Sequence, residues 1–219
     1  MPPIHATSSP ASVARTRAET KERNRRALLD AAFQLVAREG HRARLEDIAE
    51  RADLTTGAVY SLLGSKSGLL TALVEDYLRP HYQEIEQAVP PEADLLAAVD
   101  AFARYYRRSC DTPEARSDLA LQITLLDMAL HDPGLGSQIA RAIQEQEGHL
   151  AALFTGRAHA GGSVTPRQAR RLVTALRALF VGLSQGVLLD LAPGADEEFF
   201  ADAARALAVG AVGGPAGSD

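Results

Sequence analysis

Residues 45–66, LEDIAERADLTTGAVYSLLGSK, combine short and hydroxylated side chains with a closing Lys. Hydroxyls and the amides at a helix start can bind DNA phosphates, and a Thr methyl can contact the methyl group of thymine. These residue types therefore predict contacts with double-stranded DNA. The positions that carry the prediction are Thr55, Thr56, Gly57, Ala58, Tyr60, Ser61 and Lys66.

Two short helices, over residues 45–52 and 56–62, must position these side chains. Ile48 and Ala49 fall on one side of the first helix, and Leu54 and Val59 supply apolar partners across the turn and on the second helix. Asp53 lies at the turn, where it tolerates a left-handed backbone better than most residues. This layout is typical of a helix-turn-helix whose second helix enters the major groove.

A third helix, over residues 24–39, precedes these two and ends at Gly40, a natural helix stop. The combined arrangement over residues 21–81 resembles the TetR family of transcription regulators. The residues that carry the resemblance are Leu29, Ala31, Ala32, Phe33, Gly40, Asp47, Ile48, Ala49, Ala52, Leu54, Thr55, Gly57, Val59, Tyr60, Lys66 and Leu69.

The resemblance implies a dimeric repressor, which a small-molecule effector releases from a palindromic DNA operator. It also implies that the last two long helices form the interface of the homodimer. A ligand-responsive activator and an all-α interaction module without DNA binding are the alternatives. The helix that begins at Ser65 would join the two domains and act as the lever between them.

Four positions depart from the family pattern. Arg44 stands where the family usually has a Ser or Thr that caps the first motif helix, and we expect Arg44 to contact a DNA phosphate instead. Asp53 replaces the usual Gly of the turn. Leu62 and Leu63 replace a usual His-Phe pair, whose His commonly touches the DNA backbone. These departures keep the fold but make the operator sequence hard to infer from relatives.

Charge is distributed unevenly along the chain, whose formal net charge is −5. Residues 1–66 hold 11 basic and 8 acidic residues, whereas residues 67–219 hold 12 basic and 20 acidic ones. DNA affinity depends on the local basic face, so the acidic total does not exclude DNA binding. The basic excess is either a phosphate-contacting arm or a solvated helix start, and its members are Arg15, Arg17, Lys21, Arg23, Arg25 and Arg26.

Several other classes of protein lack support in the sequence. A single Cys110 excludes an internal disulfide, and no signal peptide or apolar run of about 20 residues is present, so we expect a cytoplasmic protein that does not cross a membrane. No phosphate loop or nucleophile motif indicates an enzyme, although Arg107 and Arg108 beside Cys110 could lower its pKa. Asp127 and His131 fit a helix-end charge pair better than a metal site, so no metal or cofactor is expected.

Helix caps and apolar periodicity predict an all-α chain of about nine helices. They cover residues 24–39, 45–52, 56–62, 66–88, 94–110, 113–131, 133–155, 166–191 and 195–209, with a flexible loop at 156–163. The expected organisation is a disordered or basic arm (1–20), a DNA-binding domain with a helix-turn-helix (21–81), a ligand-binding and dimerisation domain (82–210) and a flexible tail (211–219).

The second half of the helix over 166–191 is apolar nearly all round, so it must be buried on more than one side. It is either the core helix of a monomer or a helix that also faces a second subunit. The expected dimer residues are Ala178, Gly182, Gly186, Phe199, Phe200, Ala203 and Leu207.

A ligand pocket between helices would be mostly apolar with a few polar groups. Plain core packing is the alternative role for each candidate. The candidates are Phe102, Tyr105, Tyr106, Gln122, Leu125, Leu126, His149, Phe154, Phe180 and Gln185.

Overall fold

A computed structural model describes the backbone of residues 10–212 and the side chains of residues 16–76 and 83–212. The described chain is almost entirely α-helical, which confirms the predicted fold class. It divides into two compact units between Leu73 and Val74, inside one helix, whereas the sequence places the boundary near residue 81. The expected flexible segments at 1–9 and 213–219 lie outside the described residues.

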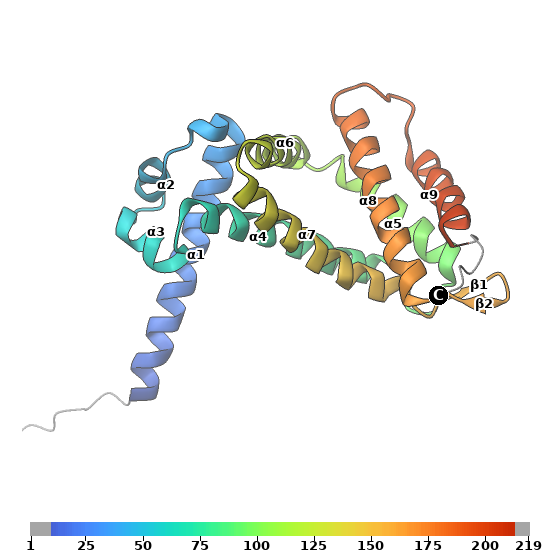
Figure 1. Ribbon diagram of the computed structural model, residues 1–219, viewed down its shortest axis with the longest axis horizontal. Helices are drawn as coiled ribbons and strands as arrows, with labels where there is room; N and C mark the ends of the chain where they lie inside the picture. The colour runs from blue at the N-terminus through green and yellow to red at the C-terminus, as the bar shows by residue number, and fades with distance from the viewer. Residues whose placement is uncertain (1–9, 213–219) are drawn as a thin grey trace, which may run out of the picture. The chain divides into compact units, whose positions relative to one another are not determined.

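The first unit contains four helices: α1 (Pro10–Glu39), α2 (Leu45–Arg51), α3 (Thr56–Leu63) and the start of α4 (Lys66–Ala88). A single 3-10 turn, η1 (Gly40–Arg42), follows α1. Figure 1 shows α2 and α3 beside the C-terminal half of α1. The apolar residues predicted to join them do so, since Ile48, Ala49 and Val59 are fully buried.

Helix α1 is longer than its apolar pattern predicts. It begins at Pro10, so residues 10–20 are helical and the expected disordered arm is wrong over that range. The described side chains of residues 16–23 are exposed, and no apolar periodicity marks them. The apolar pattern of the sequence therefore cannot predict this extension, because a solvated helix has no amphipathic pattern.

The second unit contains the rest of α4 with α5 (Leu95–Ser109), α6 (Ala115–His131), α7 (Pro133–Phe154), α8 (Pro166–Leu188) and α9 (Glu197–Val212). Helix α9 packs against α5 and α8, and α7 packs against α6 and α8. Phe180 lies at the centre of the core, 4.7 Å from Tyr106 in a stacked pair and 5.1 Å from Phe102 edge to face, measured between ring centroids.

Most helix ends fall where their caps predict. Thr165 and Gln168 form the expected capping box of α8, and the Asp132 side chain caps α7. The predicted cap at Thr112 is wrong: its hydroxyl donates to the Ser109 carbonyl oxygen, and α6 begins only at Ala115. Helix α8 stops at Leu188, earlier than predicted, because Asp190 adopts a left-handed backbone at φ 58°.

The segment expected to be a flexible loop contains a small β-hairpin. Strands β1 (Ala158–His159) and β2 (Gly162–Ser163) pair antiparallel, with Ala158 opposite Ser163. The two turn residues, Ala160 and Gly161, both have positive φ, which suits a tight hairpin turn. Two-residue strands are too short to show an alternating pattern, so sequence periodicity cannot reveal them.

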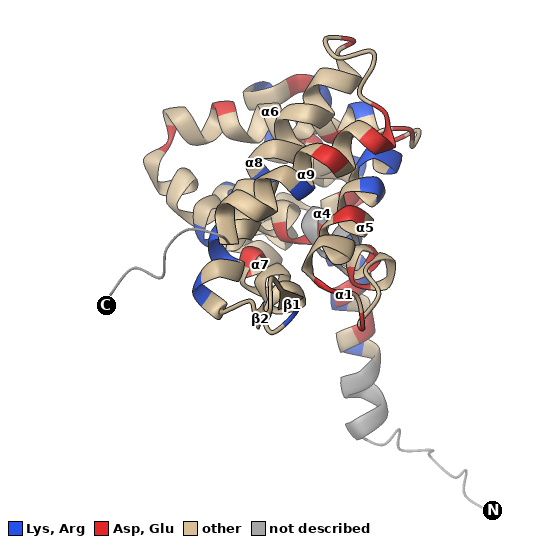
Figure 2. Ribbon diagram, turned by 90° about the vertical axis from the view of Figure 1, so that its right-hand side faces the viewer, with Lys and Arg blue, Asp and Glu red and all other residues tan. Residues whose placement is uncertain are grey.

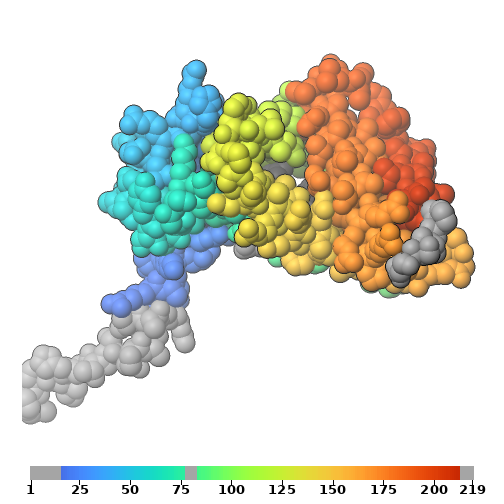
Figure 3. Space-filling view, viewed as in Figure 1, coloured from blue at the N-terminus to red at the C-terminus, as the bar shows by residue number. Residues whose placement is uncertain are grey.

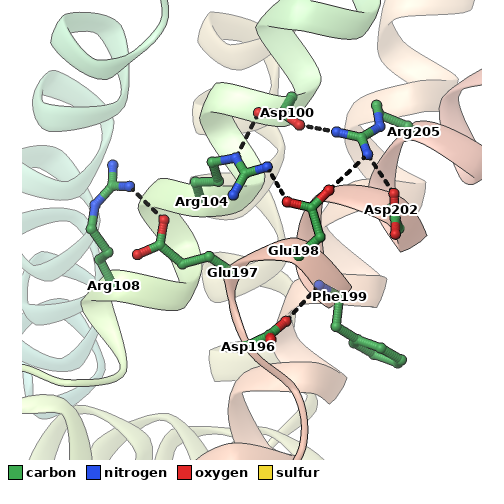
Figure 4. Close-up of polar contacts among 9 residues, drawn as sticks. All are labelled: Asp100, Arg104, Arg108, Asp196, Glu197, Glu198, Phe199, Asp202 and Arg205. Atoms are coloured by element: carbon green, nitrogen blue, oxygen red, sulfur yellow. Dashed lines mark hydrogen bonds and ion pairs between the residues drawn. The ribbon is translucent and has the colours of Figure 1, made fainter.

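Ion pairs fasten the start of α9 to α5, as Figure 4 shows. Arg104 bridges Asp100 on its own helix and Glu198 on α9, at 2.8 and 2.6 Å. Arg205 returns from α9 to Asp100. The hydrogen bond from Arg104 lowers the pKa of Glu198. This network fixes the rotation of α9 about its axis and leaves Phe199 exposed.

Candidate nucleic-acid interface and effector cavity

The turn between α2 and α3 has the geometry that a helix-turn-helix requires. Asp53 adopts the left-handed conformation expected at the turn, with φ 55°. The Leu54 amide donates to the Ala49 carbonyl oxygen at 2.9 Å, which closes the turn. Thr55 is the predicted N-cap of α3, since its hydroxyl accepts a hydrogen bond from the Ala58 amide at 3.2 Å. The sequence thus predicts this local geometry correctly.

Helix α3 carries no charged residue, and the side chains on its exposed face are small except for one aromatic ring. Thr55, Gly57 and Ser61 are exposed, and Tyr60 is 56% exposed. Thr56 and Ala58 are half-buried. The predicted DNA-contacting residues of α3 therefore lie on or next to its outer face. Their contacts with DNA remain a prediction.

The two predicted phosphate-binding cations differ in their surroundings. Arg44 is exposed and makes no capping hydrogen bond to α2, as expected, and its guanidinium lies 3.8 Å from Glu46. Lys66 instead turns inward, and its ammonium donates to the Ala43 carbonyl oxygen at 2.7 Å. Lys66 therefore ties the start of α4 to the residue before Arg44, a structural role that the sequence did not indicate.

The corner between α3 and α4 depends on a glycine that the motif analysis did not single out. A Cβ at Gly68 would lie 2.1 Å from the Leu63 carbonyl oxygen, so no other residue fits without moving the backbone. Ser65 caps α4 by accepting a hydrogen bond from the Gly68 amide at 2.9 Å. Leu62 and Leu63, which replace the family's usual His-Phe pair, are half-buried beside this corner.

The basic positions before the motif lie on α1, the last of them at Arg26. Arg17, Lys21, Arg23 and Arg26 are exposed, whereas Arg25 is half-buried. Acidic residues separate them, so blue and red alternate along the described part of this helix in Figure 2. The side chain of Arg15, the sixth predicted position, lies outside the described residues.

The second unit encloses a cavity of about 450 Å³, within the range of small-molecule sites. In Figure 3 the surface is hollowed between the yellow-green residues of α6 and α7 and the orange residues of α8. Four predicted ligand residues line this cavity: Phe102, Tyr105, Tyr106 and Gln122. Each comes from α5 or α6.

The other six predicted ligand residues do not line this cavity. Phe154 and Phe180 are fully buried in the helical core, and Leu125 is buried on α6. Leu126 and His149 are exposed, and Gln185 is half-buried. Helical periodicity identifies an apolar residue but cannot tell a packed core position from a cavity wall, because both are shielded from water.

Several residues that line the cavity were missed because they are polar or charged. They include Asp118 on α6, Ser184 and Arg177 on α8, and Cys110 after α5. Burial, with the nearby carboxylate of Glu114, raises the pKa of Asp118 to about 6. Burial also raises the pKa of the Cys110 thiol and outweighs the lowering effect of Arg107.

Five of the predicted dimer residues are exposed or half-buried on α8 and α9. Ala178, Gly182 and Phe199 are exposed, and Ala203 and Leu207 are half-buried. A side chain at Gly182 would meet nothing within 4 Å.

Two of the predicted dimer residues face their own subunit instead. Phe200 is fully buried, so its assignment to a subunit interface is wrong. A Cβ at Gly186 would lie 3.0 Å from that of Ala192, which shows that this glycine serves the sharp turn after α8.

Helix α8 is also the one helix, in the part of the chain that the structure describes, with the length and composition to cross a membrane. Two features weigh against that use. It packs against α7 and α9, and Arg170, Arg171 and Arg177 interrupt its apolar surface.

The predicted helix-end pair of α6 is present, with His131 Nδ1 lying 3.6 Å from Asp127 Oδ1. The described residues contain no group of three or more His, Cys, Asp or Glu side chains placed to hold a metal ion.

Comparison with known families finds a match within the first unit. Residues 28–73 match the bacterial regulatory proteins of the tetR family. The matched segment runs from the buried half of α1 to the start of α4 and contains the whole α2–α3 motif. No relative among curated proteins matches the chain.

Solved structures extend the likeness to both units. A protein from Rhodococcus sp. described as a TetR-family transcriptional regulator is 20% identical, with a TM-score of 0.63 over 87% of this chain and 98% of its own. A TetR-family member from Streptomyces coelicolor A3 is 25% identical, with a TM-score of 0.61 over 84% and 97%. The multidrug binding protein EbrR, solved with ethidium, is 24% identical, with a TM-score of 0.61 over 84% and 98%.

These findings agree with the geometry of the α2–α3 motif and with the all-helical second unit. Residues 28–73 therefore form a TetR-type DNA-binding domain, and the chain as a whole shares the fold of solved TetR-family transcriptional regulators.

Proposed function

We propose that the protein is a homodimeric repressor that binds a palindromic operator through α3 and leaves it when a small molecule enters the cavity of the second unit. The single observation that carries the proposal is the pairing of an uncharged, exposed α3 face with a separate cavity of about 450 Å³. A DNA reader has no need of such a cavity unless a second molecule controls it.

The exposed face of α8 and α9 supports a dimer. Small residues at Ala178 and Gly182 permit the close approach of a second helix, and the exposed rings and methyls of Phe199 and Val209 would be covered by it. A two-fold dimer would present two α3 helices to successive major grooves, about 34 Å apart. Arg44 and the exposed arginines of α1 would add phosphate contacts.

Release of DNA follows from the continuity of α4, which belongs in sequence to both units. A ligand that binds better to a dimer with mis-spaced α3 helices shifts the population toward that form. The shift cannot exceed the difference between the ligand's affinities for the two forms. The multidrug binding protein EbrR was solved with ethidium, and its likeness to this chain supports a ligand-binding role here.

The proposal is tested by sedimentation of the protein alone and with a palindromic duplex. Two protomers per duplex are expected. Gly182→Leu should yield monomers, because a large side chain would stand where the partner helix approaches. Gly148→Leu is the matched control, since Gly148 also lies exposed on a helix with nothing within 4 Å. An unchanged dimer in the Gly182 variant would contradict the assigned interface.

A further inference from the structure

The cavity wall is strongly acidic. Four carboxylates line it: Asp76 and Glu84 from α4, and Glu114 and Asp118 from the start of α6. Among the described residues, Arg177 is the one basic side chain in the wall. Its guanidinium donates to Glu147 on α7, so its charge is already matched by a carboxylate outside the cavity wall. Among the described side chains that line the cavity, carboxylates therefore outnumber basic groups.

Asp118 is the most informative of these carboxylates. It is half-buried, and its side chain has no hydrogen bond or ion pair with the part of the chain that the structure describes. Burial and the neighbouring Glu114 act in the same direction and disfavour the ionised form. A positive group placed in the cavity would reverse both effects, because it replaces lost hydration and offsets the repulsion between the carboxylates.

An aromatic wall faces the same space. Phe102, Tyr105 and Tyr106 line the cavity, and Tyr106 is held in place by its stacking on Phe180. The Tyr105 hydroxyl donates to Glu84 Oε2 at 2.7 Å, which fixes the ring and the carboxylate together. Aromatic faces attract cations, and most strongly where water is excluded.

The remaining wall is apolar, with Leu119, Leu150, Val181 and Leu188 among its members. A hydrated metal ion would gain nothing from such a surface. An organic molecule would gain by burying its own apolar area there.

From these observations we infer that the cavity selects an organic cation: a single positive charge, near Asp118, on a body large and apolar enough to cover the aromatic wall. The inference rests on the proposed effector role of the cavity and adds the chemical class of the ligand. It assigns charge recognition to Asp118 and the packing of the ligand body to Tyr106 and Phe102.

Calorimetric titration of the DNA-free protein with tetraphenylphosphonium and tetraphenylborate tests the inference, since the two ions share one shape and carry opposite charges. In sodium buffer at neutral pH the phosphonium should bind and the borate should not. Asp118→Asn should weaken phosphonium binding about tenfold. Asp127→Asn, an exposed position on the same helix outside the cavity wall, should leave it unchanged.

The pH profile adds a readout that a loss of packing would not produce. Phosphonium affinity should fall as Asp118 becomes protonated near pH 6, and Asp118→Asn should flatten that fall. The other titratable or charged groups around Asp118 are Glu114 on α6, Asp76 and Glu84 on α4, Cys110 after α5, Arg177 on α8 and Glu147 on α7. The wild type and the Asp118→Asn variant share these groups, so a difference between their pH profiles is caused by Asp118.

Borate binding equal to or tighter than phosphonium binding, or an Asp118→Asn variant with unchanged affinity, would overturn the inference. Failure of both ions to bind would overturn it as well. The proposed repressor function would survive any of these results, because operator binding by the free protein is measured without either ion. Loss of operator binding would instead remove the regulatory role and leave the charge preference of the cavity standing.

Discussion

The outer face of α3 and the cavity of the second unit differ in nearly every physical property. Helix α3 has no charged side chain and offers hydroxyls, glycine and one exposed tyrosine ring. The cavity combines four carboxylates with three aromatic rings and a buried thiol. The small side chains of α3 would let its backbone approach DNA closely. The acidic and aromatic cavity would suit a cation. The proposed DNA-binding face is therefore uncharged, whereas the proposed effector cavity is acidic, and the two lie in separate units.

The largest difference expected between the two sites is their response to salt. Operator affinity should fall by about three orders of magnitude between roughly 50 and 200 mM salt, because DNA binding releases condensed counterions. A ligand enclosed in the cavity is screened much less. Fluorescence anisotropy with labelled duplex measures the first, and calorimetry with tetraphenylphosphonium measures the second. A duplex affinity that does not change with salt would contradict this expected difference between the two sites.

The next effect concerns the fold of the first unit. Gly68→Ala should destabilise it by about 2 kcal/mol or more, since the new Cβ would overlap the Leu63 carbonyl oxygen. Gly57→Ala is the matched control on α3, where a Cβ meets Thr55 Oγ1 at an ordinary 3.7 Å. We expect the control to keep or raise thermal stability but to weaken DNA binding, because it adds bulk to the DNA-facing surface. Equal stabilities for the two variants would contradict the close approach at Gly68.

Variants at Tyr60 and Lys66 distinguish a residue that contacts DNA from one that stabilises the motif. Tyr60→Ala should weaken operator binding about tenfold with little change in thermal stability, because Tyr60 is 56% exposed. Lys66→Met should lower the free energy of unfolding by about 1 kcal/mol, since it removes the hydrogen bond to Ala43. Thermal melts beside anisotropy distinguish the two roles. A large stability loss in the Tyr60 variant would show that the ring supports the fold instead.

The last effect belongs to Asp118 and appears as a dependence of stability on pH. Its pKa is about 6 in the folded chain and near its ordinary value of 3.8 when unfolded. Between these values the folded state binds more protons, so the free energy of unfolding falls as pH rises from about 4 to about 6 and stays lower above. Asp118→Asn should remove this loss and raise stability at pH 7 by about 1–2 kcal/mol, allowing for partial exposure. Identical pH profiles for the variant and wild type would refute the burial of this charge.

The α2–α3 motif could be predicted from sequence because short-range rules determine it. The left-handed Asp53, the Thr55 cap and the buried Ile48 and Val59 each follow from residue type within one turn of the chain. Lys66 shows the limit of such rules. Its inward turn depends on the position of the Ala43 carbonyl, 23 residues earlier, which no local pattern specifies.

The cavity was only partly predictable for the same reason. Phe102 and Tyr106 were expected from their aromatic character, but Asp118 and Arg177 lie on separate helices that meet through long-range packing. Phe154 and Phe180 satisfy the same pattern and are ordinary core residues. Residue type predicts burial, whereas the empty space beside a buried residue depends on every helix around it.

Selection of bound fragments from a pool of random duplex DNA tests the central claim most directly, with the wild-type protein and Tyr60→Ala side by side. The account predicts that wild type enriches a palindrome whose half-sites lie about one DNA turn apart. The Tyr60 variant should enrich it more weakly. Absence of any enriched sequence with wild type at low salt would contradict the assignment of α3 as a DNA-reading helix.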